Sequence, residues 1–132
     1  MTKQEIFDKV ATHLLNQGEK SMNGLECAYR GGYGMSCAIG CLIPNEKYTA
    51  GMEKMGLRNP AIVNVLEDNG VDCEVTNYFL LVELMRIHDE LNVSDWPTAL
   101  ANLAERFLLN LTVFMVNVKL PVPVPINDLT TI

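Results

Sequence analysis

Over most of the chain, hydrophobic residues recur every three or four positions, the spacing of an amphipathic helix. This pattern predicts helices over residues 3–17, 60–68 and 77–91, and a fourth that begins after Ser94 and continues to Leu108. Capping residues support these ends. The caps that we expect are Thr2 with Glu5, Gly18, Asn59-Pro60, Asn69-Gly70, Thr76 or Asn77, and Ser94.

The helix at 77–91 is strongly apolar, and we expect it to form the centre of the core. Its predicted core face consists of Phe79, Leu80, Leu84, Ile87 and Leu91. The helix after Ser94 should pack against it through a short turn. The sequence therefore predicts a mostly helical α+β fold of about four helices around the central helix.

Two apolar runs around a glycine-rich connector predict a small β-hairpin within residues 25–43. The second run, 35–43, is compatible with a strand or a helical turn, and we favour a short strand followed by a buried helical turn before Pro44. Residues 18–24 should form an exposed loop. Residues 44–58 should form a long excursion with at most a turn of helix near 52–55.

The character of the sequence changes near Leu111, where β-branched and aromatic residues predict a strand. The proline-rich stretch 121–125 that follows should be extended. We therefore expect one compact domain over 1–110 and a dependent extension over 111–132. Residues 111–120 could pair two copies into a homodimer or complete the hairpin sheet of one chain, and both alternatives stay open.

The chain has 132 residues, of which 48% are hydrophobic and 20% charged, with a net charge of −6. This composition is that of a folded single domain. The negative charge makes nucleic-acid binding unlikely, because it repels phosphate backbones.

Charged residues near Met1 and the lack of a long apolar run predict a cytoplasmic protein that does not insert into membranes. In that reducing setting the four cysteines should be free thiols. We expect Cys37 and Cys41 to be buried and metal-free, because Cys27, Cys73, His13 and His88 are poorly spaced as further zinc ligands. The sequence predicts no cofactor.

One segment has the composition of a ligand-binding turn. Arg30 could donate to an anion, the glycines could bring backbone N–H groups close to it, and a tyrosine could stack on a base. The candidate site consists of Tyr29, Arg30, Gly31, Gly32, Tyr33 and Gly34. Hairpin glycines alone would explain the same pattern.

Several short motifs give the chain a resemblance to a family of small uncharacterised proteins encoded by bacteriophages and bacterial genomes. They are Tyr29-Arg30, the sequence Cys-Ala-Ile-Gly-Cys-Leu-Ile-Pro at 37–44, Tyr48, Ile87-His88-Asp89 and Trp96-Pro97. The resemblance covers residues 2–108. Asn45 replaces the acidic residue expected after Pro44, and the extension 111–132 is additional. The resemblance implies a phage-type origin and no particular chemistry.

These observations favour a small accessory protein that acts by binding, and that could inhibit a host or defence-system protein. One alternative is a binding protein for a nucleotide-like anion at 30–34. Another is an enzyme that uses Cys37 or Cys41 with a histidine. No catalytic motif is recognisable, so we expect a protein that is not an enzyme.

Overall fold

The computed structural model describes residues 1–111. Its helices are α1 (Lys3–Gln17), α2 (Pro60–Asp68), α3 (Val75–Glu90) and α4 (Trp96–Arg106). The two strands β1 (Met22–Asn23) and β2 (Glu26–Cys27) form an antiparallel hairpin. The mostly helical α+β fold that the sequence predicts is confirmed. The predicted strand and proline-rich stretch at 112–125 lie outside the described residues.

Five short 3₁₀ helices complete the described part of the chain. They are η1 (Gly32–Gly34), η2 (Gly40–Leu42), η3 (Asn45–Lys47), η4 (Ala50–Lys54) and η5 (Val93–Asp95). The buried helical turn predicted before Pro44 is η2. The turn predicted near 52–55 is η4.

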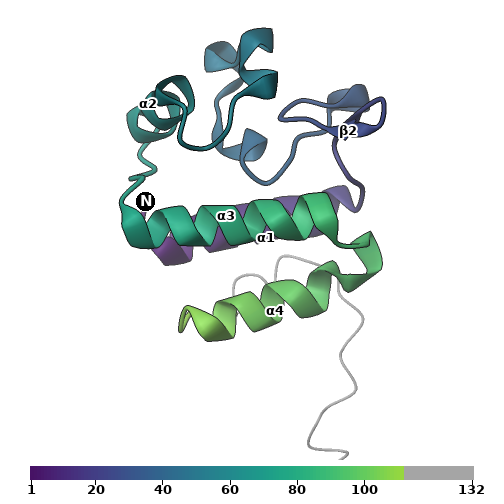
Figure 1. Cartoon of the computed structure of the whole chain (residues 1–132). Helices are drawn as coiled ribbons and strands as arrows, with labels where there is room; N and C mark the ends of the chain where they lie inside the picture. Colours follow the sequence, from purple (N-terminus) through teal and green to yellow (C-terminus); the bar gives the residue numbers. More distant parts are fainter. Residues whose placement is uncertain (112–132) are drawn as a thin grey trace, which may run out of the picture.

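Helices α1 and α3 lie side by side, with α4 on one side and α2 and the 3₁₀ turns η1 to η4 on the other (Figure 1). Helix α3 contacts both α1 and α4, so its central position is confirmed. Its buried face is formed by Leu80, Leu81, Leu84, Ile87 and His88. No helix within residues 1–111 is long and apolar enough to cross a membrane.

The ends of α1 and α2 follow the capping residues of the sequence. Thr2 and Glu5 form a reciprocal capping box, and Gly18 ends α1 in the left-handed conformation with φ of 67°. Asn59 caps α2 through the N–H of Ala61, with Pro60 at the first helical position. Local sequence therefore determines both helices.

Four expectations about α3 and α4 are wrong. The last helix does not continue to Leu108, since α4 ends at Arg106 and Leu108 is 93% exposed. Helix α3 begins at Val75, because the carboxylate of Glu74 accepts the Asn77 N–H at 3.1 Å, and Thr76 and Asn77 lie inside its first turn. Phe79 lies at the edge of the buried face and is 57% exposed. Ser94 does not cap α4, since it lies within η5 and no side chain caps that helix.

The hairpin lies earlier than the glycine-rich connector. Its first strand, β1, falls in the segment 18–24 that was expected to be an exposed loop, and β2 falls at the start of the predicted hairpin region 25–43. Asn23 pairs with Glu26, which leaves Gly24 at the first turn position, where its φ of 66° favours glycine. At the connector itself, a single bridge joins Arg30 and Ser36. The hairpin places Cys27 beside the C-terminal end of α3.

Candidate functional site

Arg30 faces the backbone of the motif at 37–44. Its guanidinium donates hydrogen bonds to the carbonyl oxygen of Gly40, to that of Ile43 at 2.7 Å and to Asn45 Oδ1 at 3.1 Å. It also lies over the ring of Tyr48, 5.0 Å from the centroid. Arg30 therefore links two segments of the chain. One runs from η2 to η3, and the other is the strand-like segment that precedes the glycine turn.

Glu53 organises the same region from η4. Its carboxylate accepts the backbone N–H groups of Tyr29 at 2.9 Å and Arg30 at 3.0 Å, and the hydroxyl of Tyr48. Loss of solvent around the phenol and its hydrogen bond to Glu53 raise the pKa of Tyr48 to about 12. The tyrosine therefore stays protonated and donates to the carboxylate at neutral pH.

The close approach of the backbone at Gly40 explains why the motif has a glycine at this position. A Cβ at this position would lie 2.1 Å from the carbonyl oxygen of Tyr29. Because this oxygen belongs to the backbone, no side-chain rotation can relieve the clash. Its neighbours Ala38, Ile39, Leu42 and Ile43 belong to the hydrophobic core. The motif that carries the family resemblance thus has a structural role in this chain.

The structure separates the residues of the predicted anion site. Tyr29 is buried and its hydroxyl donates to the Met55 carbonyl at 2.6 Å, while Tyr33 is fully exposed with φ of 58°. The backbone N–H of Gly31 donates to the Met35 carbonyl oxygen, and Gly32 and Gly34 are exposed. The guanidinium of Arg30 contacts the motif at 37–44 and not the turn. Anion binding at this turn stays a prediction.

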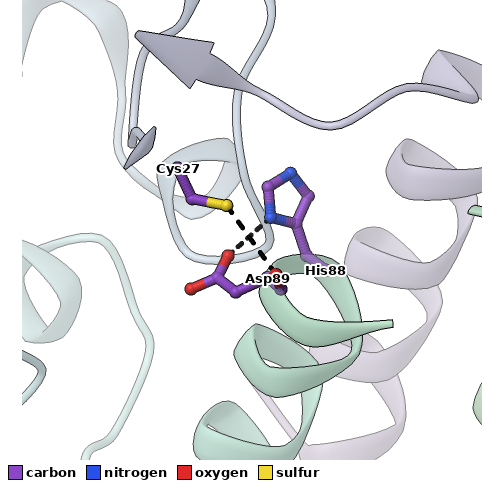
Figure 2. Close-up of side chains that lie close together, drawn as sticks. All are labelled: Cys27, His88 and Asp89. Carbon is purple, nitrogen blue, oxygen red and sulfur yellow. Dashed lines mark hydrogen bonds and ion pairs between the residues drawn. The ribbon is translucent and has the colours of Figure 1, made fainter. Parts of the chain in front are cut away.

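Three side chains that the sequence did not group meet between β2 and the end of α3. Figure 2 shows Cys27 close to His88 and Asp89, and their ligand atoms all lie within 4.8 Å of one another. Cys27 Sγ is 4.0 Å from the Asp89 carbonyl oxygen. The cluster resembles a nucleophile with a base and an orienting acid, so its hydrogen bonds decide what it can do.

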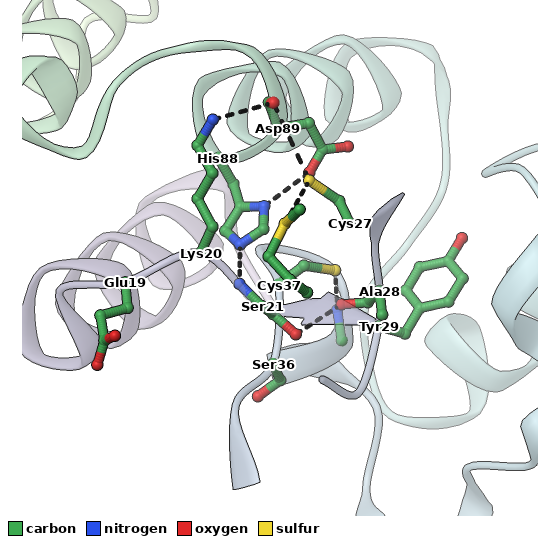
Figure 3. Close-up of polar contacts among 12 residues, drawn as sticks. Glu19, Lys20, Ser21, Cys27, Ala28, Tyr29, Ser36, Cys37, His88 and Asp89 are labelled. Carbon is green, nitrogen blue, oxygen red and sulfur yellow. Dashed lines mark hydrogen bonds and ion pairs between the residues drawn. The ribbon is translucent and has the colours of Figure 1, made fainter. Parts of the chain in front are cut away.

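The hydrogen bonds of His88 show that it is not a base for Cys27. The backbone N–H of Ser21 donates to His88 Nε2 at 2.9 Å, so this nitrogen is an acceptor (Figure 3). The proton of the neutral ring is therefore on Nδ1, which donates to Asp89 Oδ1 at 2.6 Å. With both nitrogens engaged, His88 ties the hairpin to α3 and has no lone pair for a thiol.

The thiols themselves are poor nucleophiles. Burial raises the pKa of Cys37 and of Cys41 to about 12, and burial together with Asp89 raises the pKa of Cys27. Cys37 is buried as expected, whereas Cys41 is partly exposed. All three thiols stay protonated at neutral pH, so the geometry gives no support to a Cys/His enzyme.

His13, the other histidine, joins α1 to the segment after the glycine turn. Its Nε2 lies 2.7 Å from the Ser36 carbonyl oxygen, to which it donates. Burial lowers the pKa of His13 despite this hydrogen bond. Gln17 also bonds Ser36, accepting its N–H and donating to its carbonyl. His13 is therefore a structural contact of the turn.

An apolar groove lies between the start of α2 and the first turns of α3. Its volume is about 390 Å³, and it is lined by Leu57, Arg58, Val63, Cys73, Val75, Tyr78 and Phe79. Arg58 Nε donates to the Tyr78 hydroxyl at 3.1 Å, and its guanidinium lies over the Tyr78 ring. Phe79 packs edge-on against Tyr78. The groove therefore combines two aromatic rings with one cation.

The comparisons with known proteins add no family or fold relative. No family model, no curated protein and no solved structure matches this chain.

Proposed function

We propose that this protein acts by binding a partner protein through the groove between α2 and α3. The observation that carries the proposal is the exposure of Val75 and Phe79, which lie one helical turn apart and remain 68% and 57% accessible. Exposed apolar side chains that adjoin a groove are typical of interaction surfaces. A partner that covers them would gain their hydrophobic burial.

The residue types in the groove also favour a protein partner. Aromatic residues and arginine are enriched at protein interfaces and at their energetic centres. Here Arg58 lies over the ring of Tyr78 and Phe79 contacts the same ring edge-on, so both contacts restrain Tyr78 before binding. Such preorganisation reduces the entropy lost on association.

Charge complementarity defines the chemistry of the partner segment. Arg58 is the single charged residue lining the groove, and it forms no ion pair with any residue in 1–111. The groove is thus a cationic and apolar site on a chain whose net charge is −6. We infer that it accepts an apolar segment that carries a carboxylate, which Arg58 would bind.

The family resemblance extends this proposal to a biological setting. A small phage-type accessory protein in the cytoplasm of a bacterial cell would act by binding, and inhibiting, a host or defence-system protein. The hydrogen bonds that occupy both ring nitrogens of His88 and leave Cys27 without a base support a binding role. Homodimer formation through 111–120 is a separate proposal, which light scattering of the full chain tests.

The test compares three immobilised proteins in a bacterial lysate: the wild type, Phe79→Glu and Leu25→Glu. Leu25 is the matched control, because it is 98% exposed on the hairpin turn and remote in sequence from the groove. We expect a partner that binds the wild type and Leu25→Glu but is lost with Phe79→Glu. With the purified partner, Arg58→Ala should weaken binding at least roughly tenfold, which is about 1.4 kcal/mol.

Three outcomes would contradict the proposal. Equal capture by all three proteins would show that the groove does not take part in binding. Retention of affinity by Arg58→Ala would refute the carboxylate-bearing segment. A concentration-dependent dimer that Phe79→Glu abolishes would replace the partner with a second copy of this chain.

A further inference from the structure

Several sulfur-containing side chains line a second cavity, which shares no lining residue with the groove. The cavity has a volume of about 150 Å³ and is lined by Cys27, Ala28, Tyr29, Cys37, Glu53, Met55, Met85 and Asp89. Four of these side chains carry sulfur. A fifth sulfur, Met22 Sδ on β1, lies 3.6 Å from Cys27 Sγ.

The geometry of Cys27 and Met22 suits a shared metal ion. Two sulfur atoms 3.6 Å apart can each lie about 2.3 Å from one ion, with the ion placed to one side of the line that joins them. The pairing register of the hairpin produces this contact between the two sulfur atoms, since Met22 and Cys27 are direct cross-strand partners. The backbone of the hairpin therefore holds the thiol and the thioether together before any ion binds.

The surrounding hydrogen bonds select against zinc. A zinc ion at Cys27, His88 and Asp89 would need the lone pair of His88 Nδ1. That nitrogen carries the proton, because the Ser21 N–H donates to Nε2. Moving the proton to Nε2 would place two donors against each other, so His88 is not available as a neutral ligand.

We propose that Cys27 and Met22 bind a soft monovalent metal ion of the Cu(I) class at the mouth of this cavity. Thiolate and thioether sulfurs are the ligands that select such ions. The ion replaces the proton of the Cys27 thiol, which leaves to solvent, and no oxidation or reduction takes place. Asp89 lines the same cavity, and its carboxylate, which accepts the Nδ1–H of His88, adds negative charge near the cation.

Cys27 is a better ligand than Cys37, although both line the cavity. Cys37 is buried, and its sulfur already accepts the Gly40 N–H at 3.3 Å. Cys27 is partly exposed, and its contacts are the Met22 sulfur and the Asp89 carbonyl oxygen. An ion can therefore reach Cys27 without opening the core.

The test is a Cu(I) competition titration of the full chain against a chromogenic chelator under ascorbate. We expect one Cu(I) per chain in the wild type. Cys27→Ser should lose this uptake, and Met22→Leu, which preserves side-chain volume, should weaken it at least roughly tenfold. Cys73→Ser is the matched control, since Cys73 is a partly exposed thiol that lines the groove between α2 and α3.

A second measurement follows alkylation of each cysteine by mass spectrometry. Cu(I) should protect Cys27 and leave Cys73 reactive, whereas excess Zn(II) should protect neither. Equal loss of binding in Cys27→Ser and Cys73→Ser would show non-specific thiol binding and overturn the site. Unchanged affinity in a folded Met22→Leu variant, or stoichiometric zinc bound at Cys27, would overturn it as well.

Discussion

Replacing Arg30 with alanine should strongly destabilise the fold, although its side chain lies at the edge of the core. The guanidinium bonds the carbonyl oxygens of Gly40 and Ile43 and the side chain of Asn45. After the replacement, Gly40 would retain the N–H of Ile43 as a donor. The Ile43 carbonyl would lose its hydrogen bond in a buried residue.

The magnitude follows from these three contacts. A hydrogen bond from a charged donor contributes about 1.5–3 kcal/mol, and an unpaired buried carbonyl costs about 1–3 kcal/mol. The bond to exposed Asn45 contributes little, and the contact with the Tyr48 ring adds about 0.5–1 kcal/mol. Since these contributions are not additive, we expect Arg30→Ala to lower the free energy of unfolding by about 3 kcal/mol.

Urea unfolding followed by far-ultraviolet circular dichroism measures this loss. Arg30→Lys keeps the charge but lacks the planar fork that reaches both carbonyl oxygens, so it should recover less than half of the loss. Arg58→Ala is the control, because Arg58 is exposed and stacks on Tyr78 at the surface. A loss below about 1 kcal/mol in Arg30→Ala, or full stability in Arg30→Lys, would refute this role of Arg30.

Three further predictions concern a glycine, a thiol and a histidine. Gly40→Ala should cost more than about 2 kcal/mol in urea unfolding, whereas Gly32→Ala, which has open space around its added Cβ, should change stability by less than about 1 kcal/mol. Maleimide labelling at mildly alkaline pH should modify Cys73 well before Cys37, because burial raises the pKa of Cys37 to about 12; rapid labelling of Cys37 would contradict its burial. Burial lowers the pKa of His13 below its ordinary value of 6.5, so its contribution to stability is complete above that pH and declines as the pH falls toward the lower folded value. His13→Gln should therefore reduce the pH dependence of the free energy of unfolding between about pH 7.5 and 5, and an unchanged slope would exclude this effect.

The helices could be predicted from sequence because their signals are local. Thr2 with Glu5 and Asn59 with Pro60 mark the starts of α1 and α2 within the first turn itself. The sequence pattern misplaces the start of α3, because Glu74 is an unusual cap and the hydroxyl of Thr76 donates to its carboxylate instead of capping the helix. Local preference alone could not decide which of these oxygens reaches the helix N-terminus.

The sequence pattern misplaces the hairpin for a different reason. Its strands have two residues each, which is too short for an alternating pattern to show. Gly24 was the available signal, since a glycine at the first position of a two-residue turn is typical of a hairpin. The larger glycine cluster at 31–34 gave a stronger but misleading pattern.

The candidate sites depend on contacts between distant residues. Cys27 and Asp89 are 62 residues apart, and the partners of Arg30 follow it by 10 to 15 residues along an irregular path. The sequence indicates that Arg30 carries a positive charge. It does not indicate which carbonyl groups the folded chain brings close to that charge. The same holds for Phe79, whose exposure depends on how α3 is oriented against α1 and α4.

The contacts that α1 makes with α3 and α4 have a consequence for synthesis on the ribosome. Helix α1 is made first, yet the helices that it contacts end at Glu90 and Arg106. At translation rates of about 5–20 residues per second, its apolar face waits on the order of ten seconds for them. During that interval the nascent chain exposes Ile6, Phe7 and Leu14, which makes it a substrate for chaperones that bind unfolded apolar segments.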